Sequence, residues 1–352
     1  MKTKQIWVGN VPIGGDAPIA VQSMTNTDPC DAEKTLEQIQ RLADAGCHIV
    51  RCTVPNAQAA ETMKEICARS PIPVVADIHF DYRLALAAAD AGVGAIRINP
   101  GNIGSDEHVK AVADRCREKR IPIRIGVNSG SIEKNILAKY GAPTPEAMVE
   151  SALYHISLLN RYDFDDICVS LKSSSVPDTM RAYQLMHERT NYPLHLGVTE
   201  AGTPYMGTIK SAAGIGGLLA LGIGDTIRVS LTADPVEEIH AAYAILKAVG
   251  RNDTGVNIVS CPTCGRTKID LIGIAEEVEK RVAALPVKMK VAVMGCVVNG
   301  PGEAREADIG IAGGDGVGLI FRHGEVLRKV PQDQLVDELM KEIDGMVKEQ
   351  SS

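Results

Sequence analysis

The chain has 352 residues, of which 45% are hydrophobic and 23% charged, so it can bury the cores of about two domains. Its 37 basic and 44 acidic residues give a net charge of −7, which excludes a global basic field for nucleic acid or an anionic membrane. No apolar run approaches the ~20 residues of a membrane span, and MKTKQIWVGN lacks the apolar core of a signal peptide. We therefore expect a cytoplasmic protein with no nucleic-acid or membrane partner.

A small hairpin is expected first, because residues 5–8 and 11–13 flank the turn-forming pair Gly9-Asn10. Eight short β-branched stretches then alternate with longer amphipathic ones. We predict strands at residues 19–25, 48–54, 73–78, 95–99, 122–128, 166–172, 194–199 and 226–231. Eight such units favour an α/β fold with a (β/α)8 barrel over residues 1–250, its bottom capped by the hairpin. An open doubly wound sheet also fits the periodicity but rarely has eight regular units.

The stretches between the predicted strands have the features of helices. Residues 33–45 place Leu36, Ile39 and Leu42 on one face, and Asp234 before Pro235 is typical of a helix start. Residues 129–144 instead form a long connection containing Gly and Pro, after the fifth strand. Because barrel enzymes keep their chemistry on that side, we expect this connection to be a lid or a contact site.

A second domain is expected after the polar hinge at residues 251–255. Residues 256–352 predict a smaller α+β domain. Its strands are expected at 256–260, 287–294, 309–312, 318–321 and 326–329, and its helices at 268–284 and 333–348.

Four arginines interrupt the otherwise apolar barrel strands: Arg51, Arg97, Arg124 and Arg228. Side chains alternate between the two faces of a strand, so the flanking Ile and Val face the helices and the guanidiniums point inward, as does Lys172. The same parity turns inward, or brings to the C-terminal mouth, Thr53, Asp77, His79, Asn99, Gly126, Asn128 and Ser230. Since guanidinium forks match phosphate oxygens, we expect a substrate that carries a phosphate or diphosphate.

The cations and several residues near them also have a purely structural interpretation. The cations would then form buried ion pairs with Asp77 and Glu200. Glu200 ends the seventh predicted strand at the catalytic face, so it is also an acid/base candidate. His79 either hydrogen-bonds the substrate or is a satisfied interior histidine.

Three of the nine cysteines have the spacing of metal ligands. Cys261 and Cys264 form a C-x-x-C motif after one predicted strand, and Cys296 follows the next. Three thiolates suit zinc, with His323 completing the site, or a 4Fe-4S cluster with one iron free of a protein thiolate. Glu303, after a Gly-Pro-Gly turn, is the leading fourth ligand, and the alternative is a solvent-exposed turn glutamate.

Four motifs belong together: Cys-Pro-Thr-Cys-Gly-Arg-Thr from residue 261, Met-Gly-Cys-Val-Val-Asn-Gly-Pro-Gly-Glu-Ala from 294, Arg-Ile-Asn-Pro-Gly-Asn from 97 and Thr-Glu-Ala-Gly from 199. With them the chain resembles the bacterial 4-hydroxy-3-methylbut-2-enyl diphosphate synthases of the non-mevalonate isoprenoid pathway. The match runs from the hairpin to the last helix. No large insertion separates the domains, as in the compact bacterial form rather than the three-domain plant form.

The resemblance implies a reductive ring opening. 2-C-Methyl-D-erythritol 2,4-cyclodiphosphate becomes 4-hydroxy-3-methylbut-2-enyl diphosphate, with one hydroxyl lost as water and two electrons delivered through a 4Fe-4S cluster. The implied cluster domain is residues 256–352, with ligands Cys261, Cys264, Cys296 and a displaceable Glu303. Glu200 matches the proton donor, and the diphosphate-binding set is Arg51, Arg97, Arg124, Asn128, Lys172, Arg228 and Ser230.

The resemblance also implies partners. Flavodoxin or ferredoxin supplies the electrons, and the barrel of one subunit meets the cluster of the other in a homodimer. The linker at residues 250–255 supports the dimer, because at ~3.5 Å per residue it is short for folding the second domain over its own barrel.

Two other functions fit part of the sequence. A pterin-binding transferase of the dihydropteroate-synthase type also uses inward arginines for a diphosphate, and its second domain would hold a structural zinc. The transferase reaction itself would not need the C-terminal cysteines. A non-enzymatic iron-sulfur or zinc protein would only carry electrons or scaffold partners, but the predicted anion pocket argues against it.

Overall fold

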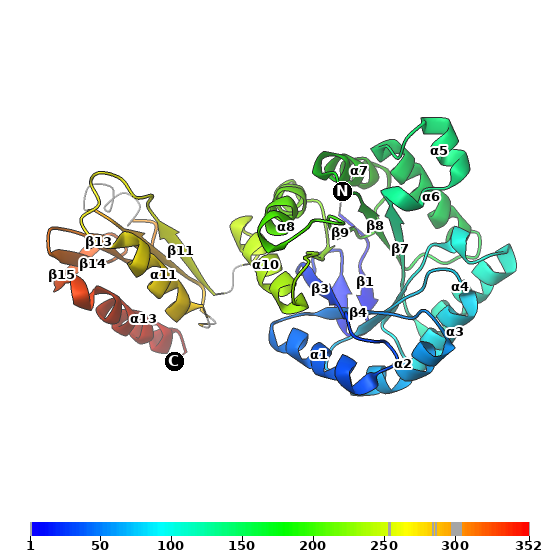
Figure 1. Cartoon of the computed structure of the whole chain (residues 1–352), viewed down its shortest axis with the longest axis horizontal. Coiled ribbons are helices and arrows are strands. Elements are labelled where there is room, and N and C mark those ends of the chain that lie inside the picture. The colour runs from blue at the N-terminus through cyan, green and yellow to red at the C-terminus, as the bar shows by residue number, and fades with distance from the viewer. Residues whose placement is uncertain (1, 253–254, 284, 286, 297–304, 352) are drawn as a thin grey trace. The chain divides into compact units, whose positions relative to one another are not determined.

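The computed structural model describes residues 2–252, 255–283, 285, 287–296 and 305–351. The chain forms two compact units, Met1–Arg251 and Asn252–Ser352, each of which has its own sheet (Figure 1). Within the described ranges, no helix combines the length and apolar character needed to cross a membrane.

The first unit is a barrel of eight parallel strands with helices around it (Figure 1). The strands pair in the order β8-β7-β6-β5-β4-β3-β10-β9, and a bridge between Val169 and Leu194 closes the ring. Their bounds are β3 Ala20–Met24, β4 Ile49–Thr53, β5 Val74–Asp77, β6 Ala95–Arg97, β7 Ile123–Asn128, β8 Ile167–Lys172, β9 His195–Leu196 and β10 Thr226–Ile227. The predicted (β/α)8 barrel is therefore confirmed.

All eight barrel strands are shorter than the sequence predicts, and β9 and β10 differ most from their predicted ranges. β9 and β10 have two residues each, because the segments that follow them leave the ladder and enter the loops of the barrel mouth. The N–H of Leu231, for example, donates to the Glu238 carboxylate at 3.1 Å.

The helices of the barrel begin at side-chain caps in several places. The Asp31, Asn56, Asp81, Thr144, Ser175 and Asp234 side chains each accept a hydrogen bond from a first-turn N–H. The helices are α1 Ala32–Asp44, α2 Ala57–Arg69, α3 Tyr82–Ala91, α4 Asp106–Lys119, α5 Lys134–Tyr140, α6 Pro145–Asn160, α7 Val176–Arg189, α8 Pro204–Ser211, α9 Gly217–Ala220 and α10 Pro235–Ala248. A π-helical turn, Ala212–Gly216, joins α8 to α9, and 3₁₀ turns occupy Pro100–Asn102 and Ser129–Ser131.

The predicted hairpin covers the bottom of the barrel. Strands β1 Ile6–Val8 and β2 Val11–Ile13 pair antiparallel, with Ile6 opposite Ile13. The hairpin forms one apolar cluster with residues near the N-terminal ends of the barrel strands, including Ile49 and Val75. This cluster covers the bottom of the barrel with apolar side chains.

Within its described residues, the second unit is a five-stranded sheet with two helices. Its strands, in sheet order, are β11 Val256–Ser260, β12 Met289–Met294, β13 Ile309–Gly313, β14 Val317–Arg322 and β15 Glu325–Pro331. β11, β12 and β13 run parallel to one another, and β14 pairs antiparallel with both β13 and β15. Helices α11 Leu271–Val282 and α13 Leu335–Ser351 share one apolar core with the sheet, and a 3₁₀ turn, Gln332–Gln334, precedes α13. α11 begins later than predicted because Asp270 caps it, accepting from Gly273 N–H.

Candidate active site

A polar cavity of about 140 Å³ lies inside the barrel. Its lining includes Asn128 and Lys172, the last residues of β7 and β8, so the cavity lies toward the C-terminal end of the barrel strands. Its lining residues are Arg51, Asp77, His79, Arg97, Arg124, Gly126, Asn128, Ser170, Lys172, Thr199, Arg228 and Ser230. The structure thus brings all five predicted cations to one place.

Strand register explains how the arginines meet. Arg97 on β6 is the register partner of Arg124 on β7, and Arg51 on β4 is the partner of Met24 on β3. The isoleucines on either side of Arg97 and Arg124 lie in the core beneath the helices. Alternation along the strands therefore sends every second side chain into the lumen.

Two carboxylates offset part of this positive charge. Asp77 lies between two guanidiniums, with Oδ1 3.3 Å from Arg97 Nη1 and Oδ2 3.7 Å from Arg51 Nε. Burial alone would raise the pKa of Asp77, but Arg51 and Arg97 outweigh burial and lower it. Glu238 on α10 lies 3.4 Å from Arg228 Nη2. The interpretation of buried ion pairs thus holds for Asp77, and it extends to an acid that the sequence analysis did not select.

Arg124 and Lys172 have no carboxylate partner among the residues that the structure describes. Arg124 Nη1 donates to the Gln22 side-chain oxygen, and its buried Nη2 has no hydrogen-bond partner among the described residues. Lys172, with 8% of its surface exposed, has no ion-pair partner in the part of the chain that the structure describes. Burial and the charges of the four arginines lower the pKa of Lys172 well below its ordinary value. The cavity therefore has an excess of positive charge that an anion would relieve.

Three residues that the sequence analysis placed at the mouth or the catalytic face of the barrel do not line the cavity: Thr53, Asn99 and Glu200. Asn99 is buried, and its amide bonds to the backbone of Gly126 in both directions, at 2.9 Å to N and 3.0 Å to O. Its side chain therefore holds β7 in place. Glu200 is exposed, next to the lining residue Thr199, and has no ion pair within the described ranges. Its φ of +51° is a left-handed conformation that is uncommon outside glycine and is often found at functional sites.

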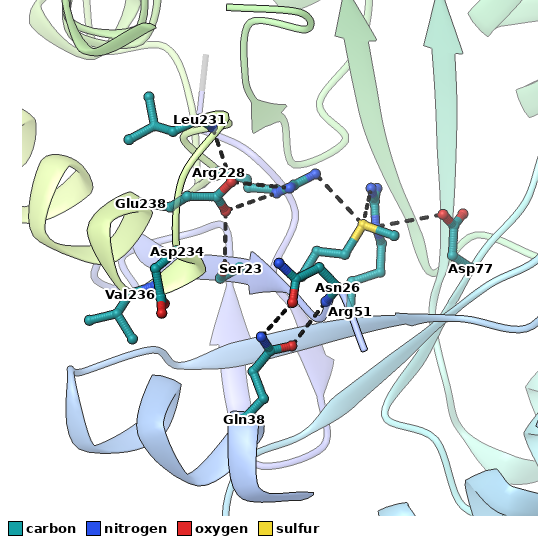
Figure 2. A network of polar contacts seen from close by, with 11 residues as sticks. Ser23, Asn26, Gln38, Arg51, Asp77, Arg228, Leu231, Asp234, Val236 and Glu238 are labelled. Atoms are coloured by element: carbon teal, nitrogen blue, oxygen red, sulfur yellow. Dashed lines mark hydrogen bonds and ion pairs between the residues drawn. The ribbon is translucent and has the colours of Figure 1, made fainter. Parts of the chain in front are cut away.

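Sequence analysis missed three residues that support the cavity. Gln22 and Met24 lie on β3, and Glu238 lies on α10, where Figure 2 shows it reaching Arg228. The presence of polar residues in a buried parallel strand could have identified Gln22. A glutamate on the buried face of α10, beside Ile239 and Ala242, could have identified Glu238.

The cysteines of the second unit follow neighbouring parallel strands. Cys261 comes after β11 and Cys296 after β12, and Gly295 N–H donates to Cys261 Sγ at 3.2 Å. Cys264 is exposed, and hydrogen bonds from Arg266 lower the pKa of its thiol. Thiols at one sheet edge, one with an N–H donor and one more acidic than usual, suit an iron-sulfur cluster.

The rest of the predicted metal site is less complete. No group of three His, Cys, Asp or Glu side chains in the described residues is arranged to hold a metal ion, and Glu303 lies outside those residues. His323 N–H bonds to Asp308 O, at the edge where β13 begins. The cysteines follow the C-terminal ends of β11 and β12, which run parallel to β13. His323 lies near the N-terminal end of β13, so it is at the opposite end of these strands. The alternative of a zinc site completed by His323 is therefore wrong.

Comparisons with known proteins cover both units. A family model described as the GcpE TIM-barrel domain matches residues 3–243, and one described as the GcpE protein C-terminal domain matches residues 257–345. A protein of Clostridium perfringens is 62% identical over 343 residues, covering 97% of this chain and 98% of its own. One of Geobacter sulfurreducens is 60% identical over 348 residues, covering 99% of each. Both are named 4-hydroxy-3-methylbut-2-en-1-yl diphosphate synthase (flavodoxin).

Two solved structures resemble about 70% of the chain. A type I 3-dehydroquinate dehydratase from Clostridium difficile has a TM-score of 0.52 and 13% identity, covering 70% of this chain and 98% of its own. A phospho-2-dehydro-3-deoxyheptonate aldolase from Thermotoga maritima has a TM-score of 0.50 and 12% identity, covering 71% and 73%. At such identity the likeness shows the fold and nothing of the chemistry.

Proposed function

The chain belongs to the GcpE family, and we propose that it is an iron-sulfur oxidoreductase that opens 2-C-methyl-D-erythritol 2,4-cyclodiphosphate reductively to 4-hydroxy-3-methylbut-2-enyl diphosphate. The observation that carries the proposal is the cavity, where four guanidiniums and Lys172 meet two carboxylates among the described residues, Asp77 in the lining and Glu238 behind it. A cyclic diphosphate supplies the missing negative charge.

The cavity is built to bind such a substrate with little rearrangement. Arg97 is held by Asp77 on one side and by Gly126 O, 2.8 Å from its Nη2, on the other. Arg51 shares the same carboxylate. Because these forks are fixed before the substrate arrives, binding costs less side-chain entropy and the diphosphate is held in one orientation. Asn128, Ser230 and His79 add hydrogen-bonding groups to the wall.

Glu200 is our candidate for the proton donor to the departing hydroxyl. It follows a lining residue and is exposed, so it can exchange protons with solvent between turnovers. A carboxylic acid beside the leaving oxygen lets that oxygen depart as water rather than as hydroxide.

Cys261, Cys264, Cys296 and Glu303 are the residues that we propose hold a 4Fe-4S cluster. Such a cluster would pass electrons to the substrate from an external donor, which we propose is flavodoxin, in line with the names of the relatives. Two contacts of the described residues support this role. Gly295 N–H donates to Cys261 Sγ, and hydrogen bonds from Arg266 favour the Cys264 thiolate, which is the form in which thiols bind iron.

We further propose a cytoplasmic homodimer in which the barrel of one copy and the cysteines of the other form each site. The support is the linker at residues 250–255, which spans about 20 Å at most. A mixed dimer of Glu200→Gln and Cys296→Ser subunits would then keep one intact site and about half of the wild-type activity. An inactive mixed dimer would exclude shared sites.

The test of the function is turnover by anaerobically purified protein with reduced flavodoxin and the cyclodiphosphate. We expect hydroxymethylbutenyl diphosphate with two electrons consumed per product, and about four irons per chain. Cys261→Ser, Cys264→Ser and Cys296→Ser should each lose most of the iron. The full-length relatives do not favour the pterin transferase. If the iron-loaded protein forms no product, the proposal is overturned.

A further inference from the structure

Glu238 is a buried carboxylate that lies behind the cavity rather than in its lining. It is on α10, and only 3% of its surface is exposed. Figure 2 shows its two oxygens meeting groups from separate parts of the barrel wall. Oε2 accepts from Ser23 Oγ on β3 at 2.9 Å, and Oε1 accepts from Leu231 N–H at 3.1 Å.

The same carboxylate holds Arg228 from behind. Arg228 Nε lies 3.4 Å from Oε2 and Nη2 lies 3.4 Å from Oε1, so the guanidinium and the carboxylate meet side by side as a fork. The third nitrogen, Nη1, lies 3.7 Å from Met24 Sδ. Arg228 itself lines the cavity, so the fork sets the direction in which its remaining donors face.

Met24 connects this arginine to the next one. Its sulfur also accepts hydrogen bonds from Arg51 Nε at 3.2 Å and from Arg51 Nη2 at 2.8 Å. A thioether is a weak acceptor that cannot neutralise either cation. Arg228 therefore depends on Glu238 as its only carboxylate partner in the described part of the chain.

An apolar residue would stabilise this position of α10 at lower cost. The neighbouring buried residues of the helix, Ile239, Ala242 and Ile245, pack as hydrocarbon. Burying a carboxylate is unfavourable unless donors surround it, and here those donors are Ser23, Arg228 and Leu231. The Leu231 bond also fixes the backbone beside Ser230, another lining residue.

We propose that Glu238 is a positioning residue, which aims Arg228 and the Ser230 segment at the diphosphate of the substrate without touching it. The proposal rests on the function proposed above. It predicts that Glu238 controls substrate affinity through Arg228 and leaves the later chemistry largely alone.

The test measures binding of the cyclodiphosphate to oxidised, cluster-loaded protein, in which no turnover occurs. Glu238→Gln keeps the shape but removes the charge, and we expect the dissociation constant to rise about tenfold or more. KM should rise in parallel, with kcat changed less than about threefold. Glu238→Asp keeps the charge and should recover part of the affinity, which a loss of folding alone would not allow.

A double-mutant cycle with Arg228→Gln tests whether the effect passes through Arg228. If it does, adding Glu238→Gln to Arg228→Gln changes affinity by less than about twofold. Asp225→Asn is the matched control. Asp225 is a partly buried carboxylate that binds Thr3 Oγ1 and Leu194 N–H and does not line the cavity, so its loss should lower stability and leave affinity unchanged.

The outcomes separate the two proposals. Wild-type protein that fails to bind the cyclodiphosphate overturns the proposed function and this inference with it. Wild-type binding combined with additive effects of the two substitutions, or with unchanged affinity in Glu238→Gln, overturns the positioning role alone.

Discussion

Asp77 and Arg97 are register partners on the neighbouring parallel strands β5 and β6, and Asp77 Oδ1 lies 3.3 Å from Arg97 Nη1. The contact is nearly buried, and the second oxygen of the same carboxylate faces Arg51. A single acid thus separates two cations that the barrel forces together. It leaves the cavity positive overall, because Arg124 and Lys172 have no acid of their own among the described residues.

Asp77→Asn should destabilise the barrel, because Arg51 and Arg97 then face each other with no charge between them. Removing one partner of a buried pair costs about 3–5 kcal/mol. Thermal unfolding checks this, and pyrophosphate should stabilise the variant more than the wild type by replacing the lost charge. An equal effect of pyrophosphate on both proteins would argue against an anion site here.

The same pair has a pH signature. The folded-state pKa of Asp77 lies below its ordinary value, so its contribution to stability is present above about pH 4 and is lost as the pH falls through the folded-state pKa. Wild type and Asp77→Asn should therefore converge in stability in acid.

Arg97→Ala and Arg124→Ala should each weaken binding of the cyclodiphosphate by about 1.5–3 kcal/mol, the range for a hydrogen bond to a charged group. Calorimetric titration measures the loss directly. Arg83→Ala is the control, because Arg83 pairs with Asp81 on the exposed start of α3 and does not line the cavity. Unchanged affinity in a folded Arg97→Ala protein would assign that side chain to structure alone.

Lys172 should take up a proton when the substrate binds. Burial and four arginines lower the pKa of its ammonium well below the ordinary value, and a bound dianion raises it again. Binding heats in two buffers of different ionisation enthalpy should differ and show proton uptake. Affinity should fall as the pH rises between the pKa of Lys172 in the free protein and its pKa in the complex, by up to about tenfold per pH unit.

Two substitutions identify the group that titrates. Lys172→Arg should bind without proton uptake, because a guanidinium remains charged in proteins. His79 also lines the cavity, so His79→Gln is the control. This variant should still take up a proton, because Lys172 is unchanged in it. Equal heats in both buffers for the wild type would contradict the prediction.

Glu200→Gln should lower kcat by at least about a hundredfold while affinity changes less than about threefold, because the amide keeps the shape but cannot donate the proton. Steady-state kinetics and binding together give this split. Glu237→Gln, at an exposed position on α10, serves as a control with no expected effect. A parallel loss of affinity would show that Glu200 binds substrate instead.

Sequence patterns were sufficient for the barrel and for its inward arginines, because strand alternation is a local property. Arg97 and Arg124 face the lumen for that reason alone. The partners of the arginines were harder to predict. Ser23 and Glu238 are 215 residues apart in the sequence, and only barrel closure brings them together. Asn99 has the right parity, yet its amide is engaged by the Gly126 backbone, a contact that no periodicity predicts.

The most direct test is a crystal structure of the protein with the cyclodiphosphate bound. We predict both phosphoryl groups inside the barrel cavity, within hydrogen-bond distance of Arg97, Arg124 and Lys172, with Asp77 still between Arg51 and Arg97. Phosphoryl groups bound anywhere else on the chain, with these cations left unliganded, would contradict the assignment of the cavity as the substrate site.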